Sequence, residues 1–146
     1  MINLKETKRI KEELNVHPEK YQEIINSTPL AICITNLQAN FVAVNDNYVK
    51  LYGYSREELI GNPFTVVLPE ANKAALKGYH DRFFADKYEI IRKWIVKNKS
   101  GQLMEIYADA GYNDKIENQP NKVTLIQFMK NVDSLPEEDG FAHTSV

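Results

Sequence analysis

Histidine and cysteine are the residues best able to carry out chemistry, and this chain of 146 residues has three histidines and one cysteine. His17, His80 and His143 fall in three different segments, without the accompanying cysteine or carboxylate spacing that is typical of a metal site. Cys33 lies inside the apolar run 30–35, where a thiol stays protonated and unreactive. The sequence therefore predicts neither a metal site nor a nucleophilic centre.

The elements that would position these residues follow from the hydrophobic periodicity. The pattern predicts helices over residues 3–15 and 72–87, with shorter helices between residues 46 and 61. It predicts strands over residues 30–35, 41–44, 88–97, 102–112 and 123–132. Two hairpin-forming groups of strands with helices between them indicate an α+β fold, in which an antiparallel five-stranded sheet carries short helices on one face.

Helix-capping signals stand at fixed spacing between Asn45 and Gly61. Asn45 can cap a helix that stops at Gly53, and Ser55 with Glu58 forms a capping box for a second helix that stops at Gly61. The segments Asn45-Asp-Asn-Tyr and Tyr52-Gly-Tyr-Ser-Arg-Glu-Glu-Leu-Ile-Gly61 resemble the signature of PAS domains. The order of elements is similar to that family over residues 19–133. The resemblance implies a PAS fold with an N-terminal flanking helix and a pocket between helices and sheet.

The flavin cofactor of light-sensing PAS domains can be compared with this sequence. The resemblance places the adduct-forming cysteine of those domains at Phe64. The two asparagines that hold the flavin ring correspond to Val96 and Ile106, and neither can supply an amide. Only Gln127 matches a flavin-contacting residue. The resemblance therefore argues against flavin.

The haem of oxygen-sensing PAS domains is bound by a histidine on the long helix, and the matching position here is Leu76. His80 lies one helical turn further along, on nearly the same face. Arg92 aligns with the arginine that those domains point at bound oxygen. With no axial ligand in place, the resemblance argues against haem too, and a haem-based sensor is kept only as a weaker alternative.

A candidate pocket follows from strand alternation combined with the resemblance. If Val96 faces the pocket, then Arg92 and Trp94 face it as well. Arg92 could hold the carboxylate of a small anionic ligand, or it could pair with a carboxylate such as Glu70 or Asp81, or reach past the rim to water. The candidate ligand-binding residues are Tyr79, His80, Arg92, Trp94 and Gln127.

Three functions are compatible with these residues. The resemblance implies a sensory and signal-transduction module that binds a small ligand or partner and transmits through its dimer geometry. A purely structural PAS domain with a core filled by large side chains such as Phe64, Trp94 and Ile106 is the alternative. An enzyme is not predicted, since acid–base candidates such as Asp109 and His80 are scattered. The expected partner in trans is a signalling protein, either a kinase of a phosphorelay or a transcription regulator.

The charge and hydropathy of the chain exclude other classes of partner. The formal net charge is -2 and the isoelectric point is about 5.9, which argues against binding to nucleic acid or to a membrane surface. The amino terminus lacks the apolar core of a signal peptide, and no apolar run approaches the roughly 20 residues of a membrane span. A single cysteine is compatible with a reducing compartment. We expect a cytoplasmic protein.

The chain divides by sequence into three parts. Residues 1–17 are expected to form a flanking helix used in dimerisation, residues 18–133 the PAS domain, and residues 134–146 a disordered tail. If Val96 and Gln127 face the pocket, the residues that alternate with them form an apolar stripe on the open face of the sheet. These are Ile91, Ile95, Ile126 and Phe128. Because such a stripe needs a cover, we expect a homodimer that uses helix 3–15 and this face.

Overall fold

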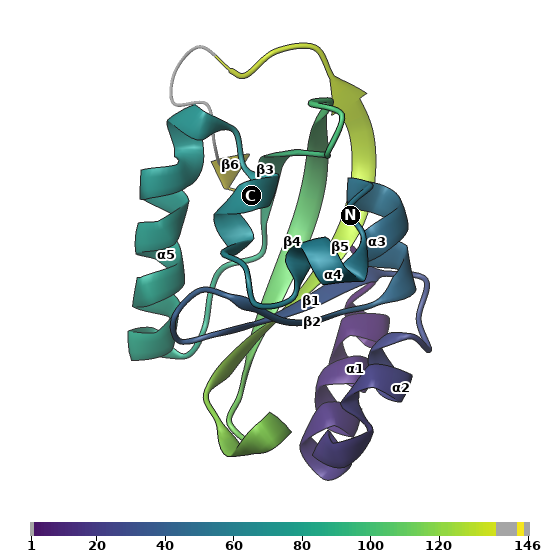
Figure 1. The fold of residues 1–146 in the computed structure, drawn as a ribbon. Helices are drawn as coiled ribbons and strands as arrows, with labels where there is room; N and C mark the ends of the chain where they lie inside the picture. The colour runs from purple at the N-terminus through teal and green to yellow at the C-terminus, as the bar shows by residue number, and fades with distance from the viewer. Residues whose placement is uncertain (1, 137–142, 145–146) are drawn as a thin grey trace.

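The centre of the structure is an antiparallel sheet with strand order β2-β1-β5-β4-β3-β6 (Figure 1). The computed structural model describes residues 2–136 and 143–144. The strands are β1 (Ala31–Asn36), β2 (Phe41–Val44), β3 (Arg92–Lys97), β4 (Leu103–Asn113), β5 (Asn121–Val132) and β6 (His143–Thr144). The predicted five antiparallel strands are confirmed, and the two residues of β6 pair with the edge of β3.

Helices lie on both sides of this sheet (Figure 1). They are α1 (Leu4–Val16), α2 (Tyr21–Ile25), α3 (Asp46–Tyr52), α4 (Arg56–Leu59) and α5 (Lys73–Asp86). Short 3-10 turns cover Pro18–Lys20, Phe64–Val67, Glu70–Asn72 and Ile116–Asn118. The arrangement confirms the predicted α+β fold with several short helices and an N-terminal helix.

The capping signals of the sequence form the expected local structure. Asn45 begins α3 by accepting a hydrogen bond from the Tyr48 amide, and Gly53 ends the helix with a left-handed φ of 78°. The Ser55 hydroxyl accepts from the Glu58 amide, and the Glu58 carboxylate accepts from the Ser55 amide in return. These bonds satisfy amide groups that a helix end leaves unpaired, and they explain why two short helices are stable at these positions.

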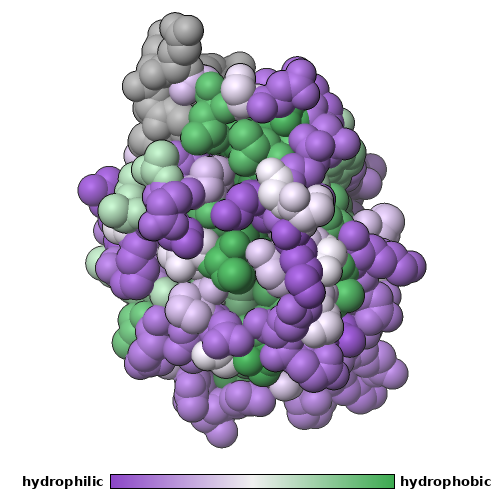
Figure 2. Space-filling view, turned by 45° about the horizontal axis from the view of Figure 1, so that its top comes forward, coloured by the Kyte–Doolittle hydropathy of each residue, from purple (hydrophilic) through white to green (hydrophobic). Residues whose placement is uncertain are grey.

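The two faces of the sheet carry separate apolar clusters. On the inner face, α3, α4 and α5 pack over a cluster that includes Tyr48, Leu59 and Trp94. On the outer face, α1 and α2 pack over a second cluster that includes Ile10 and Leu125, both completely buried. Figure 2 accordingly shows a face covered mainly by hydrophilic residues, with hydrophobic ones in separate patches. Burial on both faces of the sheet supplies most of the driving force for folding.

The N-terminal helix covers the outer face within its own chain. Ile10 and Leu14 of this helix are buried against the sheet, whereas Leu4, the third apolar residue of the helix's expected stripe, is exposed. The predicted composition of the outer face was wrong for two residues. Ile126 belongs to the inner cluster, and Phe128 pairs with Ile106, whose side chain also faces inward.

Two predicted boundaries differ from the structure. The strand expected over 88–97 begins at Arg92, since residues 88–91 pair with no other strand among the described residues. The segment 134–146, expected to be a disordered tail, lies mostly outside the described residues. His143 and Thr144 within it form β6. The expected division into 1–17, 18–133 and 134–146 stays a prediction.

Candidate ligand cavity

A cavity of about 80 Å³ lies between the inner face of the sheet and the helices above it. Its wall is mainly apolar, with contributions from Phe64 and Leu76 on the helical side and from Trp94, Val96 and Ile106 on the sheet. The polar side chains that line it are Cys33, Thr35, Tyr48, Tyr52, Tyr79, His80, Glu89, Lys122 and Thr124. A space of this size can hold a few water molecules or a ligand of a few heavy atoms.

The predicted site residues occupy three different places. Tyr79, His80 and Trp94 line the cavity, as expected. Arg92 does not line it and lies instead in a surface groove next to Tyr79. Gln127 was predicted on the wrong face: it pairs with Tyr107, which packs with the outer cluster, and its amide donates to the neighbouring Phe128 carbonyl. The structure brings together three of the five residues at the cavity.

His80 is buried and uncharged in this wall. Its Nε2 donates to the Asn36 carbonyl at 3.0 Å, and its ring stacks on Phe64 with centroids 5.0 Å apart. Burial lowers the pKa of His80 to about 4, and the nearby charge of Lys122 acts in the same direction. At neutral pH, His80 is therefore an uncharged side chain of the cavity wall. It carries its proton on Nε2 and donates it to the Asn36 carbonyl.

Arg92 is held by aromatic rings. Its guanidinium carbon lies 4.9 Å from the centre of the Tyr79 ring and 5.3 Å from that of Trp94, both within the range of cation–π attraction. Its Nε is buried and has no hydrogen-bond partner among the described residues. Arg92 therefore does not contact the cavity directly. It packs on Tyr79 and Trp94, whose side chains line the cavity.

The alternative pairing of Arg92 with Glu70 or Asp81 is not formed. Glu70 lies 2.8 Å from Lys73, and Asp81 lies 2.7 Å from Lys77, so both carboxylates bind lysines of their own helical region. Pairs three or four residues apart on a helix meet readily, which explains this choice of partner.

A group of neutral hydroxyls around the Cys33 thiol lies on another part of the wall, and although the thiol was predicted to stay protonated, its neighbours were not predicted. Tyr48 stacks on Tyr52 with ring centroids 4.3 Å apart, and the Tyr48 hydroxyl lies close enough to Cys33 and Tyr52 to interact with both. Cys33 also interacts with Thr124. Burial raises the pKa of Cys33 to about 12 and raises those of both tyrosines, so every member keeps its proton. The signal was available in the spacing of Tyr48 and Tyr52, which places them on one face of a helix.

An ion pair between Glu89 and Lys122 also lines the cavity, with 3.0 Å between Oε1 and Nζ. Sequence reasoning missed both residues. A lysine on a strand is usually exposed, and Glu89 lay in a segment that was expected to be a strand. The signal for Lys122 lay in the register, since it pairs with Thr35, another residue of the cavity wall.

Large cofactors do not fit this cavity. Pockets for drug-sized molecules have volumes of roughly 300 Å³ or more, well above that found here. Phe64 and Leu76, at the positions where the family places its flavin-reactive cysteine and haem-binding histidine, both fill the wall with carbon atoms. Neither flavin nor haem is accommodated by these residues.

The described residues form neither a metal-binding cluster nor a helix that could span a membrane. Within residues 2–136 and 143–144, no three histidine, cysteine or acidic side chains gather at distances that could hold a metal ion. None of the helices in that part of the chain has the length and apolar character required to cross a membrane.

Comparison with known proteins supports the fold. The PAS domain of a Desulfitobacterium hafniense protein is 20% identical, with a TM-score of 0.66, covering 73% of this chain and 99% of that chain. A PAS domain in complex with ethanol, from a LuxR-family transcriptional regulator of Burkholderia thailandensis, is 17% identical, with a TM-score of 0.60, covering 75% and 96%. The PAS domain of a two-component sensor histidine kinase is 15% identical, with a TM-score of 0.63, covering 78% and 97%.

Sequence comparison identifies the family. No curated protein sequence matches this chain significantly. The family model described as the PAS fold matches residues 19–106, which is more than half of the chain. The match includes the capped helices α3 and α4 and the helical wall of the cavity. The chain therefore belongs to the PAS domain family, whose members generally serve as sensory and signal-transduction modules.

Proposed function

We propose that this PAS domain is a sensor for a small, largely apolar molecule that binds in the inner cavity. The single observation that carries the proposal is the cavity itself, a space of about 80 Å³ with an apolar wall and a few neutral hydrogen-bonding groups. Apolar walls with a small number of placed polar groups are the usual composition of ligand sites. The complex of a similar PAS domain with ethanol agrees with a ligand of this size.

The protonated groups of the wall suit binding better than catalysis. Cys33, Tyr48 and Tyr52 keep their protons at neutral pH, and His80 is neutral and donates its Nε2 proton to a backbone carbonyl. Such groups offer hydrogen bonds to a ligand and no activated nucleophile. We therefore propose a non-enzymatic role, in line with the general role of the family.

Transmission is proposed to run through a homodimer and a signalling partner, a kinase or a transcription regulator. Ile10 and Leu14 are buried against the sheet of their own chain. A dimer contact through α1 would therefore use its exposed residues, such as Leu4 and Val16. Light scattering of the full chain at tens of micromolar is expected to give the mass of a dimer. A monomer at that concentration would contradict the dimer and leave the ligand proposal intact.

Ligand binding is tested by filling the cavity. Ala108 lines it from β4, so Ala108→Leu should occupy the space with three additional carbon atoms. Titration of short alcohols, followed by NMR, is expected to give saturable shifts for wild-type residues around the cavity and none for Ala108→Leu. Ala85→Leu, on the exposed side of α5, is the matched control and should behave as wild type.

The alternative of a purely structural PAS domain is decided by the same titration. Phe64, Trp94 and Ile106 already fill much of the space between helices and sheet, which favours that alternative. If no short alcohol, acid or amide gives saturable shifts in the wild type, the sensor proposal is wrong.

A further inference from the structure

The ion pair of Glu89 and Lys122 differs from the other ion pairs of the described residues. Its side chains are 11% and 10% exposed, whereas each of the others has at least one partner exposed by 31% or more. Both partners also line the cavity. Placing two charges in a low-dielectric wall has a desolvation cost that their attraction only partly offsets. The pair is therefore a feature that packing and stability alone do not explain.

Lys122 has hydrogen-bonding capacity that the pair does not use. An ammonium group has three N–H donors, and among the described residues Lys122 donates to Glu89 alone. The Lys122 Nζ also lies over the Phe83 ring, 4.9 Å from its centroid. Thr35, its strand partner, adds a hydroxyl to the cavity wall beside it. This end of the cavity can thus accept an anion.

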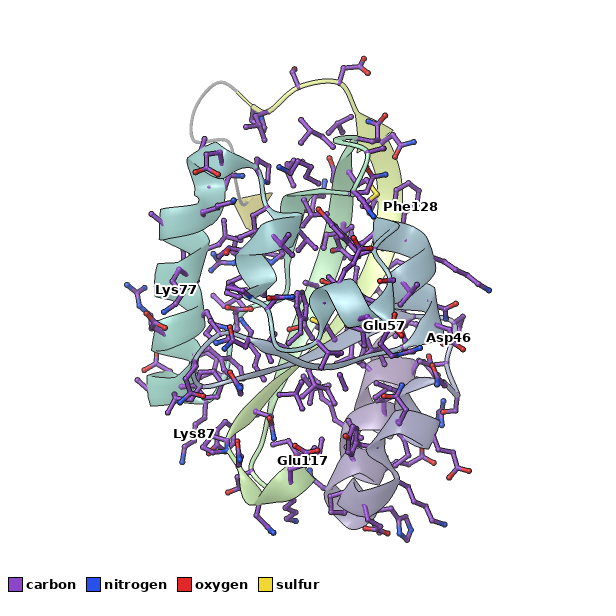
Figure 3. The ribbon with its side chains drawn as sticks, viewed as in Figure 1. Asp46, Glu57, Lys77, Lys87, Glu117 and Phe128 are labelled. Atoms are coloured by element: carbon purple, nitrogen blue, oxygen red, sulfur yellow. The ribbon has the colours of Figure 1, made fainter. Side chains whose placement is uncertain are left out.

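Glu89 belongs to a segment that is weakly fixed. Lys87, labelled in Figure 3, ends α5 with a left-handed φ of 63°, and residues 88–90 form neither helix nor strand. Tyr88 and Ile90, on either side of Glu89, are 69% and 53% exposed. No backbone hydrogen bond of residues 88–90 is found among the described residues. Segments with few contacts and exposed backbone open at low free-energy cost, so Glu89 can leave the cavity without unfolding the domain.

We propose that Lys122 is the anion anchor of the cavity, and that the carboxylate of a small monocarboxylic acid binds it in place of Glu89. The inference rests on the proposed function and names its ligand class. The hydrocarbon part of the acid lies against the apolar wall, next to residues such as Phe64 and Trp94. The cavity limits the acid to about two to five carbon atoms. Binding releases Glu89 and segment 88–90 toward solvent, so the position of this loop differs between the free and the ligand-bound domain.

The test compares butyrate, butyramide and butanol at pH 7 in calorimetric titrations. In Glu89→Gln the internal competitor is neutral, so butyrate should bind about tenfold more tightly than to wild type. Lys122→Met alone removes the counter-ion of Glu89 and thereby favours its release from the cavity, so it changes the site and segment 88–90 together. The double variant Glu89→Gln/Lys122→Met removes both charges, and it should lose butyrate binding while it keeps butanol binding. Asp81→Asn, which removes an exposed pair on α5, should bind as wild type does.

The outcomes separate this inference from the proposed function. Equal butyrate affinity in the wild type, Glu89→Gln and the double variant would overturn the role of Lys122. Binding of butanol without butyrate would overturn it too, and would leave the cavity as a site for neutral molecules. If none of the three probes binds to any variant, the proposed function fails as well. Equal binding of butyrate and butyramide would show that charge does not matter at this site.

Discussion

Lys11 of α1 lies with its Nζ 2.9 Å from each carboxylate oxygen of Asp109 on β4. The Asp109 side chain is only 7% exposed, so this ion pair holds the N-terminal helix against the outer face of the sheet. The methylene groups of Lys11 also cover Gly111, where an added Cβ would lie 3.1 Å from the lysine Cε. The helix that was expected to serve a dimer thus also packs against the sheet of its own chain.

Removal of the lysine charge should destabilise the domain. Lys11→Met keeps the methylene contacts and leaves Asp109 buried without its counter-ion, at an expected cost of about 2 kcal/mol in the free energy of unfolding. Urea denaturation measures this change. The matched control is Lys8→Met, since the pair of Lys8 with Glu12 is exposed and should contribute close to nothing. Equal effects of the two substitutions would show that Asp109 does not depend on Lys11.

Asn45 should be among the residues least tolerant of change. Its completely buried amide accepts from the Ile32 and Tyr48 amides, both at 2.9 Å. It donates to the Ile25 carbonyl at 2.6 Å and to the Leu30 carbonyl at 2.9 Å. Asn45→Asp removes both donors and places a charge beside two carbonyl oxygens. We expect a loss of about 3 kcal/mol or more in the free energy of unfolding, or no folding.

The control for this substitution lies two residues further along α3. Asn47 is partly buried and donates to the Thr28 carbonyl at 2.8 Å. Asn47→Asp should cost about 1 kcal/mol, because water can replace the lost partner. Guanidinium denaturation of the two variants gives the comparison, and a larger loss for Asn47→Asp than for Asn45→Asp would contradict the importance we assign to burial.

His80 should make the stability of the domain depend on pH. Its pKa in the folded state is about 4, below the value near 6.5 expected in the unfolded chain. The unfolded state therefore binds more protons between these values, and stability falls as pH falls from about 6.5 toward 4. The loss due to His80 between pH 7 and pH 5 is expected to be about 2 kcal/mol.

Urea denaturation of wild type and His80→Gln at the two pH values isolates this contribution. Glutamine can still donate to the Asn36 carbonyl and does not titrate, so the variant should lose less stability at pH 5. His17→Gln, a change at an exposed histidine, should follow the wild type. An unchanged pH dependence in His80→Gln would show that this imidazole does not drive the effect.

The purified protein should be colourless when its host supplies both flavin and haem. The wall formed by Phe64, Leu76, Val96 and Ile106 offers these cofactors no ligand, and the cavity of about 80 Å³ offers no room. Absorbance at roughly 350 to 600 nm, where both cofactors absorb, measures how much flavin or haem is bound. A flavin or haem band at more than trace occupancy would contradict the prediction.

Features that depend on local interactions could be predicted from the amino-acid sequence alone. The capping box of Ser55 and Glu58 and the left-handed Gly53 involve atoms a few residues apart, so their geometry is encoded by spacing alone. The family resemblance rests on the same signals, and it correctly predicted the fold. The long helix is also as expected, and its Tyr79 and His80 reach the cavity.

Which face of β5 points inward depends instead on the packing of distant segments against the sheet. Leu125 is completely buried under α1 and α2, and the neighbouring Ile126 is buried in the inner cluster. Because both faces of the sheet are covered, apolar residues follow each other along the strand and alternation cannot tell one face from the other. The prediction for Gln127 was wrong for this reason. The ion pair of Glu89 and Lys122 joins residues 33 positions apart, and no local pattern encodes a contact between two chain segments that meet only in the folded domain.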